Sequence, residues 1–125
     1  WRVGILNQEI LYVCKYHMAK GHWQIYDWSQ QEDENYGGVE AIALENTPAI
    51  VLETSLKAAN LIGDGLYGVD VKFHADKVYI IEINDNPSID ADFEDKILGT
   101  ELYRKIMMEF KRRLDESKKM QGWKN

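Results

Sequence analysis

Gly65 to Ser88 reads GLYGVDVKFHADKVYIIEINDNPS, two runs rich in β-branched and aromatic residues on either side of the polar stretch Ala75-Asp76-Lys77. Two such runs around a short polar turn are typical of a β-hairpin. Oxygen-bearing side chains occur in it at Asp70, Glu82 and Asn84. The stretch therefore predicts an antiparallel hairpin that carries candidate metal ligands.

The length of the turn decides on which face these side chains lie, because residues along a strand alternate between the two faces. If Ala75-Asp76-Lys77 forms a three-residue loop, the three candidate ligands share one face. In this register the opposed pairs are His74 with Val78, Lys72 with Ile80, Asp70 with Glu82, and Gly68 with Asn84. A two-residue loop would instead send Glu82 to the far face.

The other face of the predicted hairpin is almost wholly apolar, so we expect it to be the buried side of a sheet. Its residues are Val69, Val71, Phe73, Tyr79, Ile81 and Ile83.

Two opposed carboxylates repel, and a hard cation removes that conflict. Magnesium commonly takes one or two protein carboxylates and completes its shell with water and substrate phosphates, which makes a nucleotide the natural partner. The alternative is an ordinary hairpin with a solvated polar face.

The rest of the chain predicts a second hairpin and two helices. Arg2–Leu6, the turn Asn7-Gln8-Glu9 and residues 10–16 favour a first hairpin, and residues 23–26 favour an extended segment before a polar loop over 28–38. Asn46 or Thr47 as the N-cap and Pro48 at the first helical position predict a helix from about Thr47 to Ile62, which Gly63 ends.

A second helix is expected after the acidic, turn-like segment 90–95, because apolar residues recur along one stripe. The stripe consists of Leu98, Leu102, Ile106, Phe110 and Leu114, and we interpret the basic residues near its C-terminal end as a solvated face. The order of elements predicts an α+β fold with an antiparallel sheet backed by helices, as one domain over residues 1–125.

Composition excludes several classes of function. A net charge of -6 and a pI near 5.0 argue against a nucleic-acid surface or an anionic membrane surface. The one cysteine, Cys14, lies in an apolar run and favours a small core residue in a cytoplasmic protein. The abrupt start at Trp1 leads us to expect a piece of a longer protein.

Two motifs carry a resemblance to a known family. Residues 66–71, LYGVDV, followed by residues 80–88, IIEINDNPS, resemble the C-terminal half of ATP-grasp carboxylate-amine ligases, most closely the RimK-like glutamate ligases and glutathione synthetases. The hairpin over residues 2–16 and the helix leading into Gly65 also fit, so the resemblance covers about four fifths of the chain.

The resemblance implies an ATP-dependent reaction in which a carboxylate forms an acylphosphate and an amine displaces the phosphate. It implies ATP and Mg²⁺, with Mn²⁺ as a second ion, as cofactors. The ligands would be Asp70 on one ion, Glu82 bridging two, and Asn84 on the second. Substrates would be a small-molecule or peptide carboxylate and an amine, and Asn86 and Ser88 would contact the acceptor.

The resemblance also implies a basic residue just past the first hairpin that contacts phosphate or substrate, and for this catalytic role we select Lys15 and Lys20. We interpret Arg2 as a strand-edge charge without a catalytic duty. Ser88 stands where many members of the family have glycine.

The chain contains no preceding lobe with the adenine-binding lysines and glycine-rich phosphate loop of the ATP-grasp fold. We therefore expect the fragment to be inactive without the N-terminal lobe. Two other hypotheses remain: a non-catalytic module that binds a partner through Trp23, Tyr26 and Trp28, and a purely structural domain.

Overall fold

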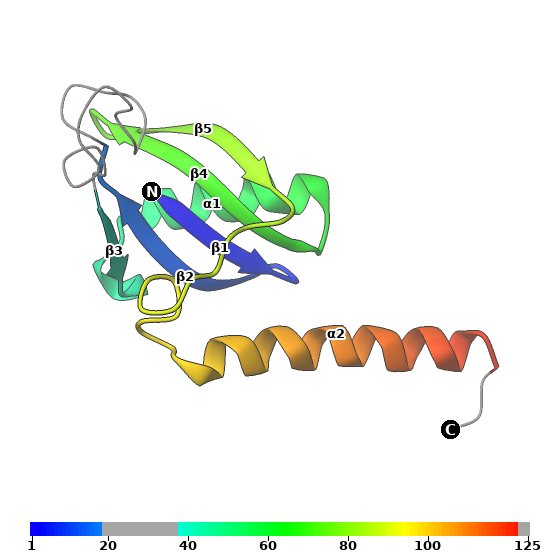
Figure 1. The fold of residues 1–125 in the computed structure, drawn as a ribbon. Helices are drawn as coiled ribbons and strands as arrows, with labels where there is room; N and C mark the ends of the chain where they lie inside the picture. The colour runs from blue at the N-terminus through cyan, green and yellow to red at the C-terminus, as the bar shows by residue number, and fades with distance from the viewer. Residues whose placement is uncertain (19–37, 123–125) are drawn as a thin grey trace, which may run out of the picture.

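The computed structural model describes residues 1–18 and 38–122 as a five-stranded antiparallel open sheet with two helices packed against it (Figure 1). The strand order is β3-β2-β1-β4-β5. The strands are β1 (Arg2–Leu6), β2 (Glu9–Tyr16), β3 (Val39–Ile42), β4 (Leu66–His74) and β5 (Lys77–Asn84); the helices are the short 3₁₀ helix η1 (Leu44–Asn46), α1 (Ala49–Ile62) and α2 (Thr100–Met120). The predicted α+β class is confirmed.

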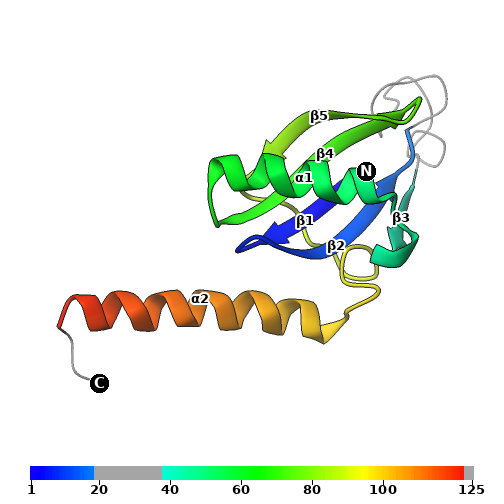
Figure 2. The same ribbon diagram turned by 180° about the vertical axis from the view of Figure 1, so that it is seen from behind.

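The two long helices lie on different sides of the sheet. Figure 2 shows α1 in front of the strands that cover it in Figure 1, whereas α2 runs along one end of the sheet in both views. Two buried clusters follow from this arrangement: Val3, Ile5, Val13, Val51, Ala59, Val69 and Val71 under α1, and Leu6, Leu11, Tyr12, Cys14, Leu102 and Ile106 under α2. Cys14 is a core residue, as predicted, and burial raises the pKa of its thiol to about 12.

Helix α1 occupies nearly the predicted residues, with one shift at its start. Pro48 is the N-cap and Ala49 the first helical residue, so the helix begins one position later than the sequence indicates. Val51, Ser55 and Ala59 are buried on its sheet-facing side, and Gly63 ends it as expected. The helix packs on one face of the sheet, mainly over β4, β5 and β1.

The β4–β5 turn corrects the predicted three-residue loop. His74 pairs with Lys77, so the turn holds only Ala75 and Asp76, whose φ angles of 48° and 59° are left-handed. Such two-residue turns match the twist of a hairpin. The predicted pairs of His74 with Val78 and of Lys72 with Ile80 are therefore wrong.

A β-bulge restores the register that the shorter turn would have lost. The pairing shifts by one residue between Asp70 and Val71, with Ile81 as the extra residue, so Asp70 still lies opposite Glu82 and Gly68 opposite Asn84. The bulge also changes the apolar face. Tyr79 and Ile81 were predicted to be buried, but they lie outside the core and are 52% and 62% exposed. Val78 packs against the α1-side core instead.

Helix α2 is predicted correctly, but only the first part of its apolar stripe is buried. Leu98, Leu102 and Ile106 contact the sheet-side cluster, whereas Phe110 and Leu114 are exposed. Residues spaced by four drift around a helix of 3.6 residues per turn, so the later members of the stripe turn away from the side that faces the sheet. The residues that continue toward the sheet are Glu109 and Arg113, and Arg113 donates a hydrogen bond to the backbone oxygen of Asp64.

The first hairpin also closes with a two-residue turn, Asn7-Gln8, and not with the predicted three-residue turn. Strand β3 was not predicted; it is four residues long and pairs with Val13 to Tyr16 of β2. The predicted extended segment at 23–26 lies outside the described residues. None of the described helices is both long and apolar enough to span a membrane.

The left-handed turn makes a testable prediction about Ala75. Replacement of Ala75 by glycine should raise the free energy of unfolding by about 1 kcal/mol, because a side chain at φ 48° is strained and glycine is not. The matched control is Ala58→Gly in the interior of α1, which should lower the same quantity by about 1 kcal/mol. Urea unfolding of both variants measures the difference, and a loss of stability in Ala75→Gly would contradict the turn described here.

Candidate metal-binding face

Two rows of residues cross the sheet on the face opposite α1. One row consists of Cys14, Arg2, Asp70 and Glu82, and the next consists of Tyr12, Gly4, Gly68 and Asn84, each residue being the ladder partner of its neighbours. Tyr12 and Cys14 belong to the cluster beneath α2, so both rows lie on that side of the sheet. All three predicted metal ligands are therefore on one face, at its β4–β5 end.

Asp70 is held by Arg2 from the neighbouring strand. Nε and Nη2 of Arg2 donate to Oδ1 and Oδ2 of Asp70 at 2.7 and 2.9 Å. This two-bond geometry is the strongest arrangement of guanidinium and carboxylate, and hydrogen bonding to Asp70 raises the pKa of Arg2. The side chains are only 17% and 30% exposed, so the carboxylate is fixed in orientation before any ligand arrives.

A chain of hydrogen bonds continues from Arg2 across the sheet. Nη1 of Arg2 donates to the hydroxyl of Tyr16 at 3.3 Å, and its guanidinium carbon lies 4.8 Å from the centroid of the Tyr16 ring. The Tyr16 hydroxyl donates in turn to Oε1 of Glu94, which is 3% exposed. Oε2 of Glu94 accepts the backbone N–H of Asp90 at 2.8 Å. The segment that follows the ligand strand is thus tied to the sheet.

Glycines let the chain after β5 fold back onto the ligand face. A side-chain carbon at Gly68 would lie 2.8 Å from Cβ of Pro87, and one at Gly4 would lie 2.1 Å from the ring of Tyr12. Asn84 starts the reversal, because its Oδ1 accepts the backbone N–H of Asn86 at 2.9 Å. Asn86 therefore lies beside Asn84, and Ser88 directly follows the proline that packs on the face.

The donor set fits a hard divalent cation. Asp70 and Glu82 supply two carboxylates from adjacent strands, and Asn84 supplies an amide oxygen two ladder positions away, which is the next position on the same face. A carboxylate bound by one arginine keeps further lone pairs for a second partner. The described residues contain no cluster of three or more His, Cys, Asp or Glu side chains able to hold a metal, so water and substrate oxygens would complete the shell.

The structure does not bring Lys15 to this face. Lys15 follows Cys14 on β2 and so points to the α1 side, where its Nζ lies 5.3 Å from the centroid of the Trp1 ring. Lys20 lies outside the described residues, as do Trp23, Tyr26 and Trp28 of the partner-binding hypothesis. Among the described residues, Arg2 lies on the ligand face, as does Lys72, two residues beyond Asp70 on the same strand.

Sequence reasoning missed Arg2, Tyr16 and Glu94 as parts of the site. No turn joins β1 to β4 and fixes their register, so the pairing of Arg2 with Asp70 emerges only in the structure. No local signal marks Glu94, since acidic residues in a turn are ordinarily solvated. Its burial depends on a long-range contact with Tyr16.

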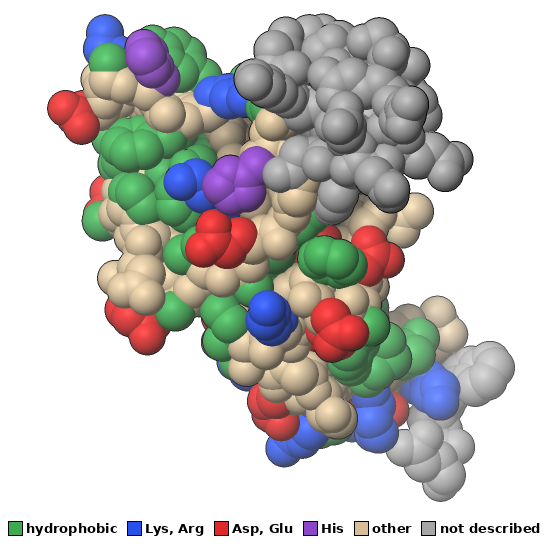
Figure 3. All heavy atoms as spheres, turned by 60° about the vertical axis from the view of Figure 1, so that its left-hand side comes forward, with side chains coloured by type: hydrophobic (Ala, Val, Ile, Leu, Met, Phe, Trp, Pro, Cys, Tyr) green, Lys and Arg blue, Asp and Glu red, His purple; other side chains and the backbone are tan. Residues whose placement is uncertain are grey.

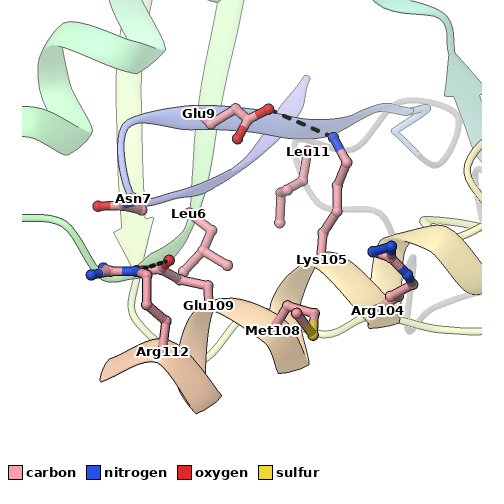
Figure 4. A pocket seen from close by; sticks show the side chains of 9 residues that line it. All are labelled: Leu6, Asn7, Glu9, Leu11, Arg104, Lys105, Met108, Glu109 and Arg112. Atoms are coloured by element: carbon pink, nitrogen blue, oxygen red, sulfur yellow. Dashed lines mark hydrogen bonds and ion pairs between the residues drawn. The ribbon is translucent and has the colours of Figure 1, made fainter. Parts of the chain in front are cut away.

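A hollow of about 400 Å³ lies between the β1–β2 turn and α2, and none of the predicted metal ligands lines it (Figure 4). Its cations are already paired: Nζ of Lys105 is 3.6 Å from Glu9, and Arg112 donates to Glu109. Hydrogen bonds from Arg112 and then Arg113 lower the pKa of Glu109 to about 2, so this carboxylate stays charged at neutral pH. The charged side chains Glu9, Lys105, Glu109 and Arg112 of the hollow thus neutralise one another.

The surface of the described residues carries both signs of charge. Among the described residues on the side shown in Figure 3, basic and acidic side chains are interspersed, and no large area carries one sign.

Tyr16→Phe tests the hydrogen-bond chain. At neutral pH it should lower the free energy of unfolding by about 1–3 kcal/mol, because buried Glu94 loses a donor. Burial, followed by the hydrogen bond to Glu94, raises the pKa of Tyr16 above its usual value of 10.0. The stability that this shift contributes is present below about pH 10 and is lost as the pH rises further.

Urea unfolding at several pH values measures both effects. Above about pH 10, the free energy of unfolding should fall less steeply with pH in Tyr16→Phe than in the parent chain. Tyr103→Phe is the control, because the exposed hydroxyl of Tyr103 donates to Asp95 and its loss leaves no buried group unpaired. An equal effect of the two substitutions would count against a buried chain from Arg2 to Glu94.

Comparisons of this chain with protein-family models, with curated proteins and with solved structures found no significant match. The candidate site therefore rests on the motif residues and on the geometry described above.

Proposed function

We propose that this chain supplies the metal-binding sheet of an ATP- and Mg²⁺-dependent ligase of the ATP-grasp type, which joins a carboxylate to an amine. The observation that carries the proposal is the register of the β4–β5 hairpin, with Asp70 opposite Glu82 and Gly68 opposite Asn84 on the face that α1 leaves uncovered. A bulge maintains this register despite a two-residue turn, and that local irregularity supports a functional requirement at the ligand positions.

The residues around the ligands suit phosphoryl transfer. Bound Mg²⁺ would neutralise the charge that spreads over a transferring phosphoryl group. Arg2 holds the Asp70 carboxylate in one orientation through two hydrogen bonds, which makes it a positioning residue. Glu82 is exposed and lies directly opposite Asp70, so the two carboxylates could share a cation.

The segment after β5 suits an acceptor-binding role. Pro87 packs on Gly68, and Asn84 accepts the N–H of Asn86, so Asn86 and Ser88 emerge at the edge of the ligand face. A second lobe of the same protein would form the opposite wall and provide the phosphate-binding lysines. On this proposal the isolated chain binds metal weakly and does not catalyse.

Metal binding by the isolated chain tests the first half of the proposal. Titration with Mn²⁺, followed by electron paramagnetic resonance, should show a site that Glu82→Gln weakens by at least about tenfold. Asp70→Asn should weaken it as well and also lose stability, because Arg2 loses its partner. The matched control is Asp76→Asn at the far turn, which removes the same charge without changing binding.

The second half concerns the reaction. A longer protein that contains this chain and the preceding lobe should release ADP from ATP only when a carboxylate substrate is present, and Glu82→Gln should abolish the release. Absence of ADP release with every carboxylate–amine pair, in a protein that binds ATP, would reject the ligase. Equal Mn²⁺ binding by the parent chain and Glu82→Gln would reject the metal site.

A further inference from the structure

An uncovered apolar stripe runs along α2, separate from the residues that contact the sheet. It consists of Tyr103, Met107, Phe110 and Leu114, which are 38%, 63%, 39% and 62% exposed. Leu102 and Ile106, by contrast, are buried against the strands. In Figures 1 and 2 the last turns of α2 extend past the sheet, so the strands leave this part of the helix uncovered.

The spacing of the stripe is that of a helix–helix seam. Its members follow one another at intervals of four, three and four residues, which is the a/d pattern of a coiled coil. One residue corresponds to about 100° around a helix, so the stripe lies roughly a quarter turn from the line of Leu102, Ile106 and Glu109 that faces the sheet. A narrow seam of this kind suits one helix as its occupant.

The outer flank of the stripe is basic. Arg104, Lys111 and Lys118 recur every seven residues, the first two directly after Tyr103 and Phe110, on the side away from the sheet. Within the part of the chain that the structure describes, Arg104 and Lys111 pair with Glu101 and Asp115 of their own helix, at 3.6 and 2.6 Å. Such exposed pairs within one turn are worth little, so these cations can exchange partners.

The sign of this flank disfavours a second copy of the chain. An antiparallel pair of α2 helices would place Arg104, Lys111 and Lys118 against the same basic row, and a parallel pair would place that row against Arg113. The acidic net charge of -6 of the whole chain likewise disfavours an anionic membrane. A helix with acidic residues at the flanking positions satisfies both the apolar and the charged features.

We propose that the α2 stripe, Tyr103, Met107, Phe110 and Leu114, is a docking surface for an acidic amphipathic helix of a partner protein. The apolar residues of the partner would fill the seam, and its Glu or Asp residues would pair with Arg104, Lys111 and Lys118. This surface does not depend on the proposed metal site.

A designed peptide pair tests this proposal with the 125-residue chain. Both peptides carry leucine at the seam positions over about three heptads; one has Glu and the other Lys at the flanking positions. Fluorescence anisotropy should show that the Glu peptide binds, that added salt weakens it, and that the Lys peptide does not bind. Leu114→Glu should weaken binding by at least about tenfold, and Lys111→Glu should weaken it as well.

The matched control is Leu61→Glu in α1, because Leu61 is also an exposed leucine on a helix, 87% exposed. It should leave binding unchanged, and circular dichroism should show all variants folded. Equal binding of the two peptides, or equal loss in Leu61→Glu and Leu114→Glu, would overturn the proposal. Failure of the Glu peptide to bind would also overturn the proposal if the chain instead associates with itself or binds anionic vesicles, and if Leu114→Glu abolishes that association or binding.

Discussion

Two carboxylates face each other across adjacent strands at Asp70 and Glu82, and such a pair is unfavourable unless positive charge lies close by. Arg2 supplies that charge through two hydrogen bonds to Asp70. The constraint reaches further, because Arg2 also contacts Tyr16, and Tyr16 donates to the buried Glu94. The chain that leads from β5 to α2 is therefore anchored by the same cation that makes the acidic pair tolerable.

Two glycines on this face make room for neighbouring groups. Gly4 and Gly68 are ladder partners, and their missing side chains make room for Tyr12 on one strand and for Pro87 from the returning chain. Among the described residues, the cluster beneath α2 fills the end of this face that contains Tyr12 and Cys14, and Asp70 and Glu82 do not belong to it. One sheet thus holds a packed core on one face and both a core and a polar site on the other.

Much of this arrangement follows from the sequence. The α+β class, the extent of α1 and the opposition of Asp70 and Glu82 could be predicted from periodicity and parity. The turn length and the bulge could not be predicted in this way. A two-residue turn with a bulge and a three-residue loop without one both place Asp70 opposite Glu82 and Gly68 opposite Asn84. Lys15 illustrates a second limit, since a position taken from a family resemblance does not say on which face of this sheet the side chain lies.

The bulge at Ile81 has a consequence for the free edge of the sheet. β5 is an edge strand with three consecutive apolar residues, Tyr79, Ile80 and Ile81, at least 40% exposed. A regular strand of that composition would be a template for pairing with other chains, and natural proteins often interrupt such edges with bulges. The irregularity that sets Glu82 opposite Asp70 therefore also protects the chain against aggregation through β5.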